Sequence, residues 1–187
     1  MNPGFADRPI SDLPARSVSG RYTRRALLWL TTTTTVYLLL NGAQVFETAV
    51  VVPNWTAAPP ESLYLLQGPH GLDLKNFWIV FHSLHELTFI TALILCWKIK
   101  MVRRQLILLL VVHIGMRVWT LTYFAPNIVA FQGMPASPTV DQSLVERADE
   151  WAFLNYVRVG TYLAISLAFI PLIRRTARLL NAHAATT

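Results

Sequence analysis

The sequence predicts an all-α protein, an integral membrane four-helix bundle with both termini in the cytoplasm. Three observations support this prediction. Of the 187 residues, 53% are hydrophobic and only 14% are charged, whereas a soluble domain carries about 25% charged residues. Four segments are apolar over the roughly 20 residues that a helix needs to cross a bilayer. Finally, the basic residues are concentrated on one side of these segments.

The four apolar segments cover residues 26–52, 76–97, 105–126 and 151–173. Lipid offers no hydrogen-bond partners to the backbone, so each segment is expected to be an α-helix. Together they make one domain, residues 26–173. A polar segment with several prolines, residues 1–25, precedes the domain and is predicted to be a disordered cytoplasmic tail. A basic cytoplasmic tail, residues 174–187, follows it.

Three connections join the predicted helices. Residues 53–75 and 127–148 are rich in proline and are predicted to be loops, and the short stretch KIKMVRR links the second and third helices. Basic residues favour the cytoplasmic side of a membrane. Twelve of them flank one side of the bundle and two, Lys75 and Arg147, flank the other. The twelve are Arg8, Arg16, Arg21, Arg24, Arg25, Lys98, Lys100, Arg103, Arg104, Arg174, Arg175 and Arg178.

This charge distribution predicts insertion in the cell (inner) membrane with the N and C termini in the cytoplasm. It also accounts for the formal net charge of +6, so nucleic acid is not predicted as a partner. The expected partners are the lipid bilayer and a lipophilic small molecule. The one cysteine, Cys96, excludes an intramolecular disulfide.

Each predicted helix also carries polar residues three or four positions apart, a spacing that places them on one face. These residues are Asn41, Gln44 and Glu47; His82, His85 and Glu86; His113 and Arg117; and Asn155, Arg158 and Tyr162. An ionisable group at the centre of a membrane helix costs about 2.5–3.5 kcal/mol, so the four faces should meet inside the bundle.

We count inward from the outer membrane boundary at about 1.5 Å per residue. Most of the ionisable residues then lie in the outer half of the membrane, and His113 lies deeper, at roughly 20 Å. The sequence therefore predicts a polar cavity on the extracytoplasmic side of the bundle.

Such a cavity suits acid–base catalysis, in which a histidine beside a carboxylate takes a proton and an arginine stabilises the resulting anion. His82 or His85 is the expected base, assisted by Glu86 or Glu47. Predicted catalytic residues are Glu47, His82, His85, Glu86, Arg117, Asn155 and Arg158. Predicted substrate-binding residues are Asn41, Gln44, His113, Trp119, Tyr123 and Tyr162.

Two alternatives remain open. The first is a redox protein with a metal or haem. His82, His85, Glu86 and Glu47 offer nitrogen and oxygen ligands for iron, copper or zinc, and His113 with His82 or His85 could ligate haem. The second is a non-catalytic protein that binds lipid or assembles a complex, in which the same polar residues only hold the helices together. The sequence does not identify a cofactor: the catalytic reading needs none, and the first alternative needs a metal ion or haem.

Three stretches, NGAQVFETAVVVPNW, VWTLTYFAP and WAFLNYVRVG, resemble the anthrone oxygenase-like family of small four-helix membrane proteins, which is largely a domain of unknown function. The resemblance spans roughly residues 26–173. The residues that carry it are Glu47, Pro53, Trp119, Tyr123, Pro126, Trp151, Asn155 and Arg158. It implies a monooxygenase-type oxidoreductase that oxidises a lipophilic aromatic or polyketide-like substrate with molecular oxygen and without a recognised cofactor motif. The stretch FHSLHELTF, which holds His82, His85 and Glu86, is not part of this pattern.

Overall fold

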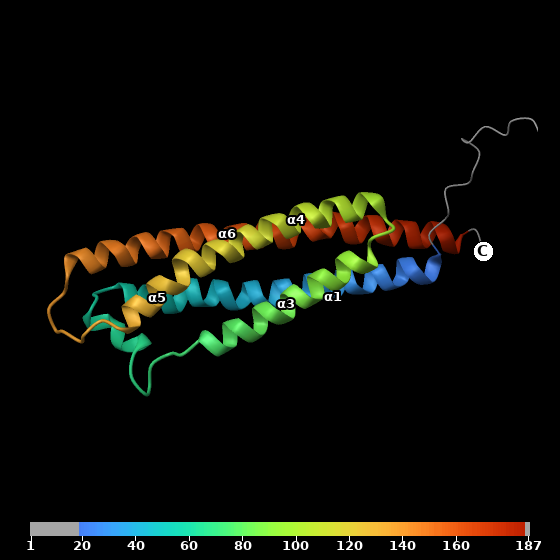
Figure 1. Cartoon of the computed structure of the whole chain (residues 1–187). Coiled ribbons are helices and arrows are strands. Elements are labelled where there is room, and N and C mark those ends of the chain that lie inside the picture. The colour runs from blue at the N-terminus through green and yellow to red at the C-terminus, as the bar shows by residue number, and fades with distance from the viewer. Residues whose placement is uncertain (1–18, 186–187) are drawn as a thin grey trace, which may run out of the picture.

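A computed structural model describes residues 19–185, and every regular element in this range is a helix (Figure 1). The long helices are α1 (Gly20–Phe46), α3 (Lys75–Leu95), α4 (Lys100–Trp119) and α6 (Gln142–Ala184). The short ones are the π-helices η2 (Glu47–Val51) and η4 (Thr120–Phe124), the 3-10 helix η3 (Glu61–Leu66), and α2 (Val52–Thr56) and α5 (Ala125–Gln132). The all-α prediction is confirmed, and four helical segments are long and apolar enough to cross a membrane.

The helices extend further than the sequence predicted. The first begins at Gly20, because the Ser19 side chain accepts a hydrogen bond from the backbone N–H of Tyr22 and caps the helix. Residues 20–25 are thus helical, while residues 1–18 of the predicted tail lie outside the described residues. In the same way Asp141 accepts bonds from the N–H groups of Ser143 and Leu144 and starts α6 nine residues before the predicted boundary at 151.

The predicted loops and the C-terminal tail are correspondingly shorter. Helix α6 continues to Ala184, so most of the predicted tail 174–187 is helical. The predicted loop 53–75 contains most of α2 and all of η3. Proline is tolerated in the first turn of a helix, and Pro53 occupies that position in α2. The predicted loop 127–148 likewise loses residues at both ends, to α5 and to α6.

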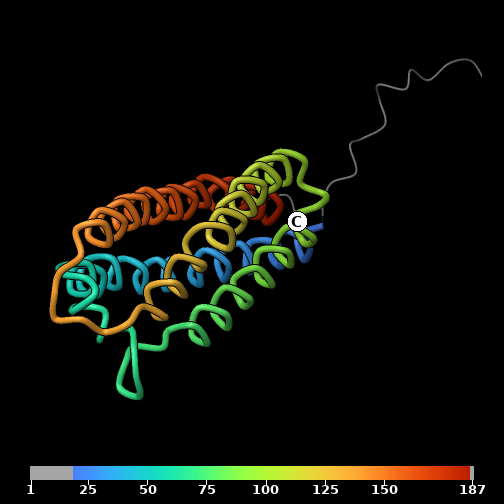
Figure 2. The backbone as a smooth tube through the Cα atoms, turned by 60° about the vertical axis from the view of Figure 1, so that its left-hand side comes forward, coloured from blue at the N-terminus to red at the C-terminus, as the bar shows by residue number. Residues whose placement is uncertain are grey.

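The four long helices do not pack equally. Helix α1 packs closely against α6 and α3, and α4 packs against α6. Of the long helices that are neighbours, α3 and α4 have the weakest contact, although only a short linker joins them (Figure 2). The start of α1 and the end of α6 lie at the same end of the molecule (Figure 1). Gly20 lies so close to the His183 ring that an added Cβ would be 3.2 Å from it.

Two apolar clusters occupy the two ends of the bundle. One, nearer the chain ends, includes Ala26, Leu30, Leu106, Phe169 and Leu172. The other, which we call the aromatic cap, closes the opposite end. It consists of Val52, Trp55, Leu63, Phe124, Phe131, Ala148 and Trp151.

Both π-helices directly precede a proline turn. The N–H of Val52 bonds to the carbonyl of Glu47 and the N–H of Ala125 bonds to that of Thr120, five residues back in each case. Pro53 and Pro126 come next in the chain. A proline ring crowds the carbonyl four residues before it, and a π-turn relieves this crowding without ending the helix. Such turns are frequent at functional sites.

Candidate functional site

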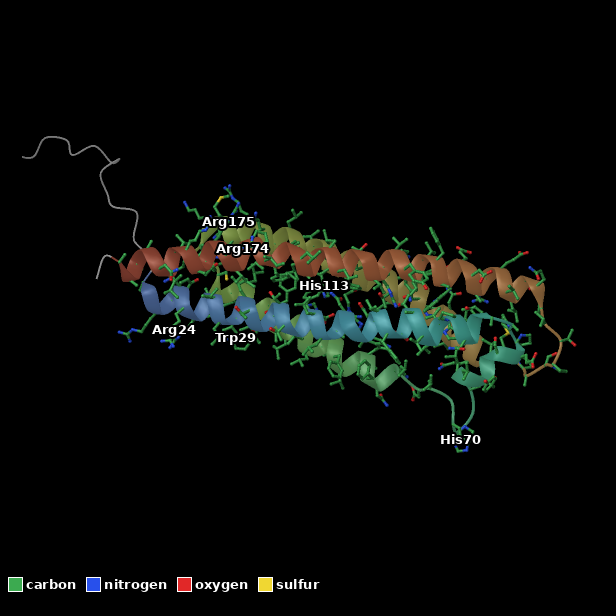
Figure 3. All side chains as sticks on the ribbon, turned by 180° about the vertical axis from the view of Figure 1, so that it is seen from behind. Arg24, Trp29, His70, His113, Arg174 and Arg175 are labelled. Atoms are coloured by element: carbon green, nitrogen blue, oxygen red, sulfur yellow. The ribbon has the colours of Figure 1, made fainter. Side chains whose placement is uncertain are left out.

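The polar faces of the four helices meet between the two apolar clusters. His113 lies midway along the molecule, well away from Arg24, Arg174 and Arg175 near the chain ends (Figure 3). We call the residues that gather at this level the polar layer. They are Tyr37, Asn41, Gln44, Glu47, Thr48, His82, His85, Glu86, His113, Arg117, Asn155, Arg158, Tyr162 and Ser166.

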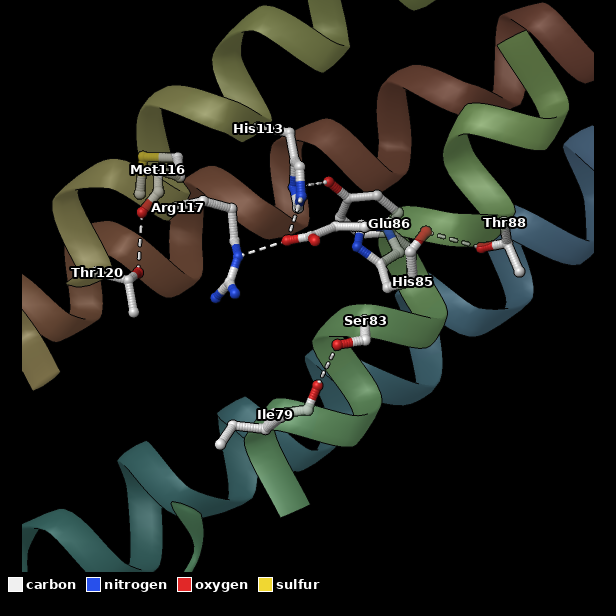
Figure 4. A network of polar contacts seen from close by, with 10 residues as sticks. Ile79, Ser83, His85, Glu86, Thr88, His113, Met116, Arg117 and Thr120 are labelled. Atoms are coloured by element: carbon white, nitrogen blue, oxygen red, sulfur yellow. Dashed lines mark hydrogen bonds and ion pairs between the residues drawn. The ribbon is translucent and has the colours of Figure 1, made fainter. Parts of the chain in front are cut away.

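One part of the polar layer is a chain of contacts that links α1, α4 and α3 (Figure 4). The Tyr37 hydroxyl lies 2.7 Å from Nδ1 of His113. Nε2 of His113 lies 3.9 Å from Oε1 of Glu86, and the same oxygen accepts a 2.6 Å hydrogen bond from Nε of Arg117. His113 is buried, but the Glu86 side chain is 40% exposed and that of Arg117 22%. The ion pair thus joins α3 to α4 at the side where these helices pack least.

The two histidines of α3 lie beside this chain. The His85 ring is fully buried and contacts Tyr37 edge to face, with 3.6 Å between ring centroids, and its centroid lies 4.8 Å from that of His113. His82 lies between the rings of Trp78 and Tyr162, at centroid distances of 5.6 and 6.5 Å. His85 has no hydrogen-bond partner at either ring nitrogen, and His82 has none at Nδ1.

A second part of the polar layer holds Arg158 between α1 and α6. Nδ2 of Asn155 donates a 2.8 Å hydrogen bond to Oγ1 of Thr48, and Oδ1 of Asn155 accepts a bond from Nη2 of Arg158. The guanidinium group also stacks 4.2 Å from the centroid of the Phe124 ring. In the described part of the chain, no carboxylate lies within 4.0 Å of Arg158. Glu47 acts on it electrostatically from further away and also interacts with Trp78.

The Asn41 amide of α1 faces α6. Asn41 donates through Nδ2 to Oγ of Ser166 and, at 3.3 Å, to the backbone carbonyl of Tyr162. Its own side-chain oxygen and that of Gln44 are buried without partners. The Tyr162 hydroxyl is also unpartnered by hydrogen-bond geometry, although Thr120 lies near it.

Unpartnered polar atoms are concentrated in this layer. All eight buried side-chain nitrogen and oxygen atoms that lack a partner among residues 19–185 belong to it. They are Asn41 Oδ1, Gln44 Oε1, His82 Nδ1, His85 Nδ1 and Nε2, His113 Nε2, Arg158 Nε and Tyr162 Oη. Each such atom costs about 1–3 kcal/mol when it is left unsatisfied, and native proteins contain few of them. The layer is therefore suited to receive a polar guest.

Some predicted site residues lie elsewhere. Trp119 and Tyr123 contact Phe124 of the aromatic cap, at centroid distances of 5.0 and 5.1 Å, and Tyr123 interacts with Glu150 and Arg147 instead of the histidines. The residues of the metal alternative do not form a ligand set. Nowhere in residues 19–185 do three His, Cys, Asp or Glu side chains gather as a metal ion requires.

Three residues of the polar layer, Tyr37, Thr48 and Ser166, were missed by the sequence reasoning. Tyr37 and Thr48 look unremarkable in an apolar helix, where tyrosine and threonine are tolerated. The signal was spacing. Tyr37, Asn41, Gln44 and Thr48 follow one another at intervals of four, three and four residues on one face of the continuous helical run Gly20–Thr56, and Ser166 follows Tyr162 by four residues in α6.

No protein-family model matches the chain, and no curated protein or solved structure is similar enough to indicate a family. The resemblance to anthrone oxygenase-like proteins stays a prediction, and the function is argued from the geometry of the polar layer.

Proposed function

We propose that this protein is an integral membrane enzyme with both termini in the cytoplasm. Support comes from the four helices of spanning length, from the basic residues, twelve on one side and two on the other, and from the position of both described chain ends at one end of the bundle (Figure 1). In this orientation the polar layer lies within the membrane and the aromatic cap faces outward.

Cysteine labelling in intact cells tests this topology. With Cys96 replaced by alanine, single cysteines at Ala57 and Ser137 should react with a membrane-impermeant maleimide, and a cysteine at Ala182 should react only after permeabilisation. Labelling of Ala182→Cys in sealed cells would reverse the orientation.

The reaction we assign is proton abstraction from a weakly acidic, lipophilic aromatic or polyketide-like substrate, as the first step of its oxidation by molecular oxygen. In the overall reaction a ring CH₂ group and O₂ give a carbonyl group and water. The observation that carries this assignment is the position of His113 between Tyr37 and Glu86. A neutral imidazole whose Nδ1–H is held by the Tyr37 oxygen has a free lone pair on Nε2, and that atom has no hydrogen-bond partner.

His113 therefore replaces His82 and His85 as our candidate base. The Glu86 carboxylate lies beside Nε2 of His113 and would stabilise the imidazolium ion that forms when the proton is taken. Arg117 fixes the position of that carboxylate. A lipophilic substrate can reach the site directly from the bilayer between α3 and α4, where Glu86 and Arg117 are partly exposed.

One observation favours a second, non-catalytic candidate. The Glu86–Arg117 ion pair bridges α3 and α4, the most weakly packed pair of neighbouring long helices. In a purely structural protein this bridge would serve to hold α3 and α4 together, and the polar layer would bind lipid or stabilise a complex.

Turnover measurements separate the two candidates. Purified protein in lipid nanodiscs would be screened with anthrones and related phenols by oxygen consumption and product absorbance. Glu86→Gln and His113→Gln should lower turnover by about 10²-fold or more, while the exposed Glu150→Gln provides a matched control at the parent rate. Folded Glu86→Gln and His113→Gln variants that turn over at the parent rate, or a protein that consumes none of these compounds, would favour the structural role.

A further inference from the structure

Arg158 has no part in the proton abstraction described above, and its surroundings point to a role in binding. We infer that Arg158, Tyr162 and His82 form a binding site for a single oxyanion, such as an enolate, phenolate or carboxylate, carried on a lipophilic body. This inference rests on the proposed function for the identity of the substrate, but not for the binding itself.

The buried positive charge of Arg158 favours an anionic ligand. A guanidinium group stays protonated in proteins, and Arg158 is only 9% exposed. Its direct contacts, Asn155 and Phe124, are neutral, and no carboxylate of the described residues lies within 4.0 Å of it. A buried positive charge without a close counter-ion is costly. An anionic ligand would supply the missing charge.

Unpartnered hydrogen-bond donors near Arg158 also favour an anionic ligand. Nε of Arg158 and the hydroxyl of Tyr162, one helical turn further along α6, are both buried and unpartnered. Nδ1 of His82 is likewise free, and the His82 and Tyr162 rings lie 6.5 Å apart. These three groups, from α6 and α3, can all donate a hydrogen bond, and an oxyanion is stabilised by two or three such donors in a dry site.

Two arginine charges act on the other two residues of the site. The charges of both Arg117 and Arg158 act on His82 and on Tyr162. Glu86 holds Arg117 at 2.6 Å and offsets its charge, whereas Arg158 has no such close partner. Glu86 also acts on Tyr162, and Glu47 acts on Arg158, but both arginine charges act on Tyr162 more strongly than Glu86 does. This balance favours an anionic ligand over a cationic one.

The site also lies suitably for the proposed reaction. The Tyr162 ring is 5.8 Å from the His113 ring and 6.5 Å from the His82 ring, so Tyr162 neighbours both the candidate base and His82. When Nε2 of His113 takes the proton from a carbon next to a carbonyl group, the electron pair of the broken C–H bond moves onto the carbonyl oxygen. Arg158 and Tyr162 would hold the enolate oxygen that results.

A matched pair of probes tests the inference. The planar acid 9-anthracenecarboxylate and the neutral alcohol 9-anthracenemethanol would be titrated into purified protein in detergent at pH 7, with binding followed by thermal stabilisation and by anthracene fluorescence. The parent protein should bind the acid more tightly than the alcohol by about tenfold or more, because hydrogen bonds to charged groups contribute about 1.5–3 kcal/mol.

Substitutions then assign the preference to the site. Arg158→Gln should abolish the preference for the acid and, as a check that it is folded, should bind the alcohol as the parent does. Tyr162→Phe, a smaller change, should weaken binding of the acid several-fold and leave binding of the alcohol unchanged. Arg147→Gln, at an arginine bonded to Asn127 near the aromatic cap, should keep the full preference.

Equal binding of the two probes by the parent, or a preference for the acid that persists in both Arg158→Gln and Tyr162→Phe, would overturn the inference. These outcomes are separate from the test of the proposed function. Normal turnover in Glu86→Gln and His113→Gln with intact acid binding would refute the catalysis alone. Loss of acid preference with catalysis still dependent on Glu86 would refute the oxyanion site alone.

Discussion

The two arginines at the centre of the molecule differ in how their charge is compensated. Arg117 is 22% exposed and has a carboxylate partner, Glu86, at 2.6 Å. Arg158 is only 9% exposed, yet its hydrogen-bond partner is the neutral Asn155. The cost of an unpaired charge rises with burial, so an arrangement that served stability alone would place the counter-ion at Arg158. The close counter-ion instead lies at Arg117, and Glu47 acts on Arg158 only from further away. This asymmetry is what the proposed anion site requires.

The helices around Arg158 also pack more closely than those around Arg117. Arg117 lies where α4 packs weakly against α3, and its ion pair with Glu86 supplements this weak packing. Arg158 projects from α6, which packs closely against α1, and Asn155 connects it to Thr48 of η2. Tight packing can hold an uncompensated charge in place, whereas the looser side needs the ion pair.

The largest expected effect on stability comes from removing the one hydrogen bond that holds Arg158. Asn155→Leu leaves the guanidinium and Thr48 without this partner in a buried place, and should lower the free energy of unfolding by about 3 kcal/mol. Asn127→Leu is the matched control, because Asn127 accepts two hydrogen bonds from the less buried Arg147, and it should cost less than about 1 kcal/mol. Denaturation in mixed micelles measures both. Equal losses would mean that burial does not distinguish the two arginines.

A smaller effect is expected at the other arginine. Glu86→Gln and Arg117→Gln each leave one charge unpaired, and each should cost about 1–2 kcal/mol, since the pair is partly exposed. The double substitution leaves no charge unpaired and should recover at least half of either loss. Thermal unfolding of the four proteins gives the coupling free energy. Strictly additive losses would show that the ion pair does not compensate for the weak packing of α3 against α4.

The smallest effect is expected from Tyr37→Phe, which keeps the ring against His85 and removes only the hydrogen bond to His113. We expect a loss of about 1 kcal/mol. Tyr22→Phe, where the hydroxyl accepts an exposed hydrogen bond from the Lys98 N–H, serves as the control and should be close to neutral. If the two variants lose the same free energy of unfolding, the Tyr37–His113 hydrogen bond contributes no more than a surface hydrogen bond.

The sequence predicted the helices well because a long apolar run has few other structures open to it. It misplaced their ends because short-range groups decide them. Ser19 and Asp141 cap helices in polar stretches that read as tails or loops, and Pro53 begins a helix where proline was taken as a sign of a loop.

Spacing named most residues of the polar layer, but it omitted Tyr37, Thr48 and Ser166, added Trp119 and Tyr123, and did not fix which side chains pair. The catalytic and binding roles of these residues stay predictions. Spacing alone showed which residues share a face, and the structure brings those faces together. Partner choice depends on how each helix is rotated and tilted, which spacing does not reveal. Glu86 therefore contacts Arg117 and His113 of α4, although the sequence placed it with the histidines of its own helix.

The length of α6 has a practical consequence for imaging. Its 43 residues make a rod about 64 Å long, roughly twice the thickness of the hydrocarbon core of a bilayer. A soluble helical protein fused so that its first helix continues from Ala184 would be held at a fixed angle outside the micelle. Such a rigid marker would let a chain of only 187 residues be aligned in single-particle electron microscopy, with and without a bound anthracene acid.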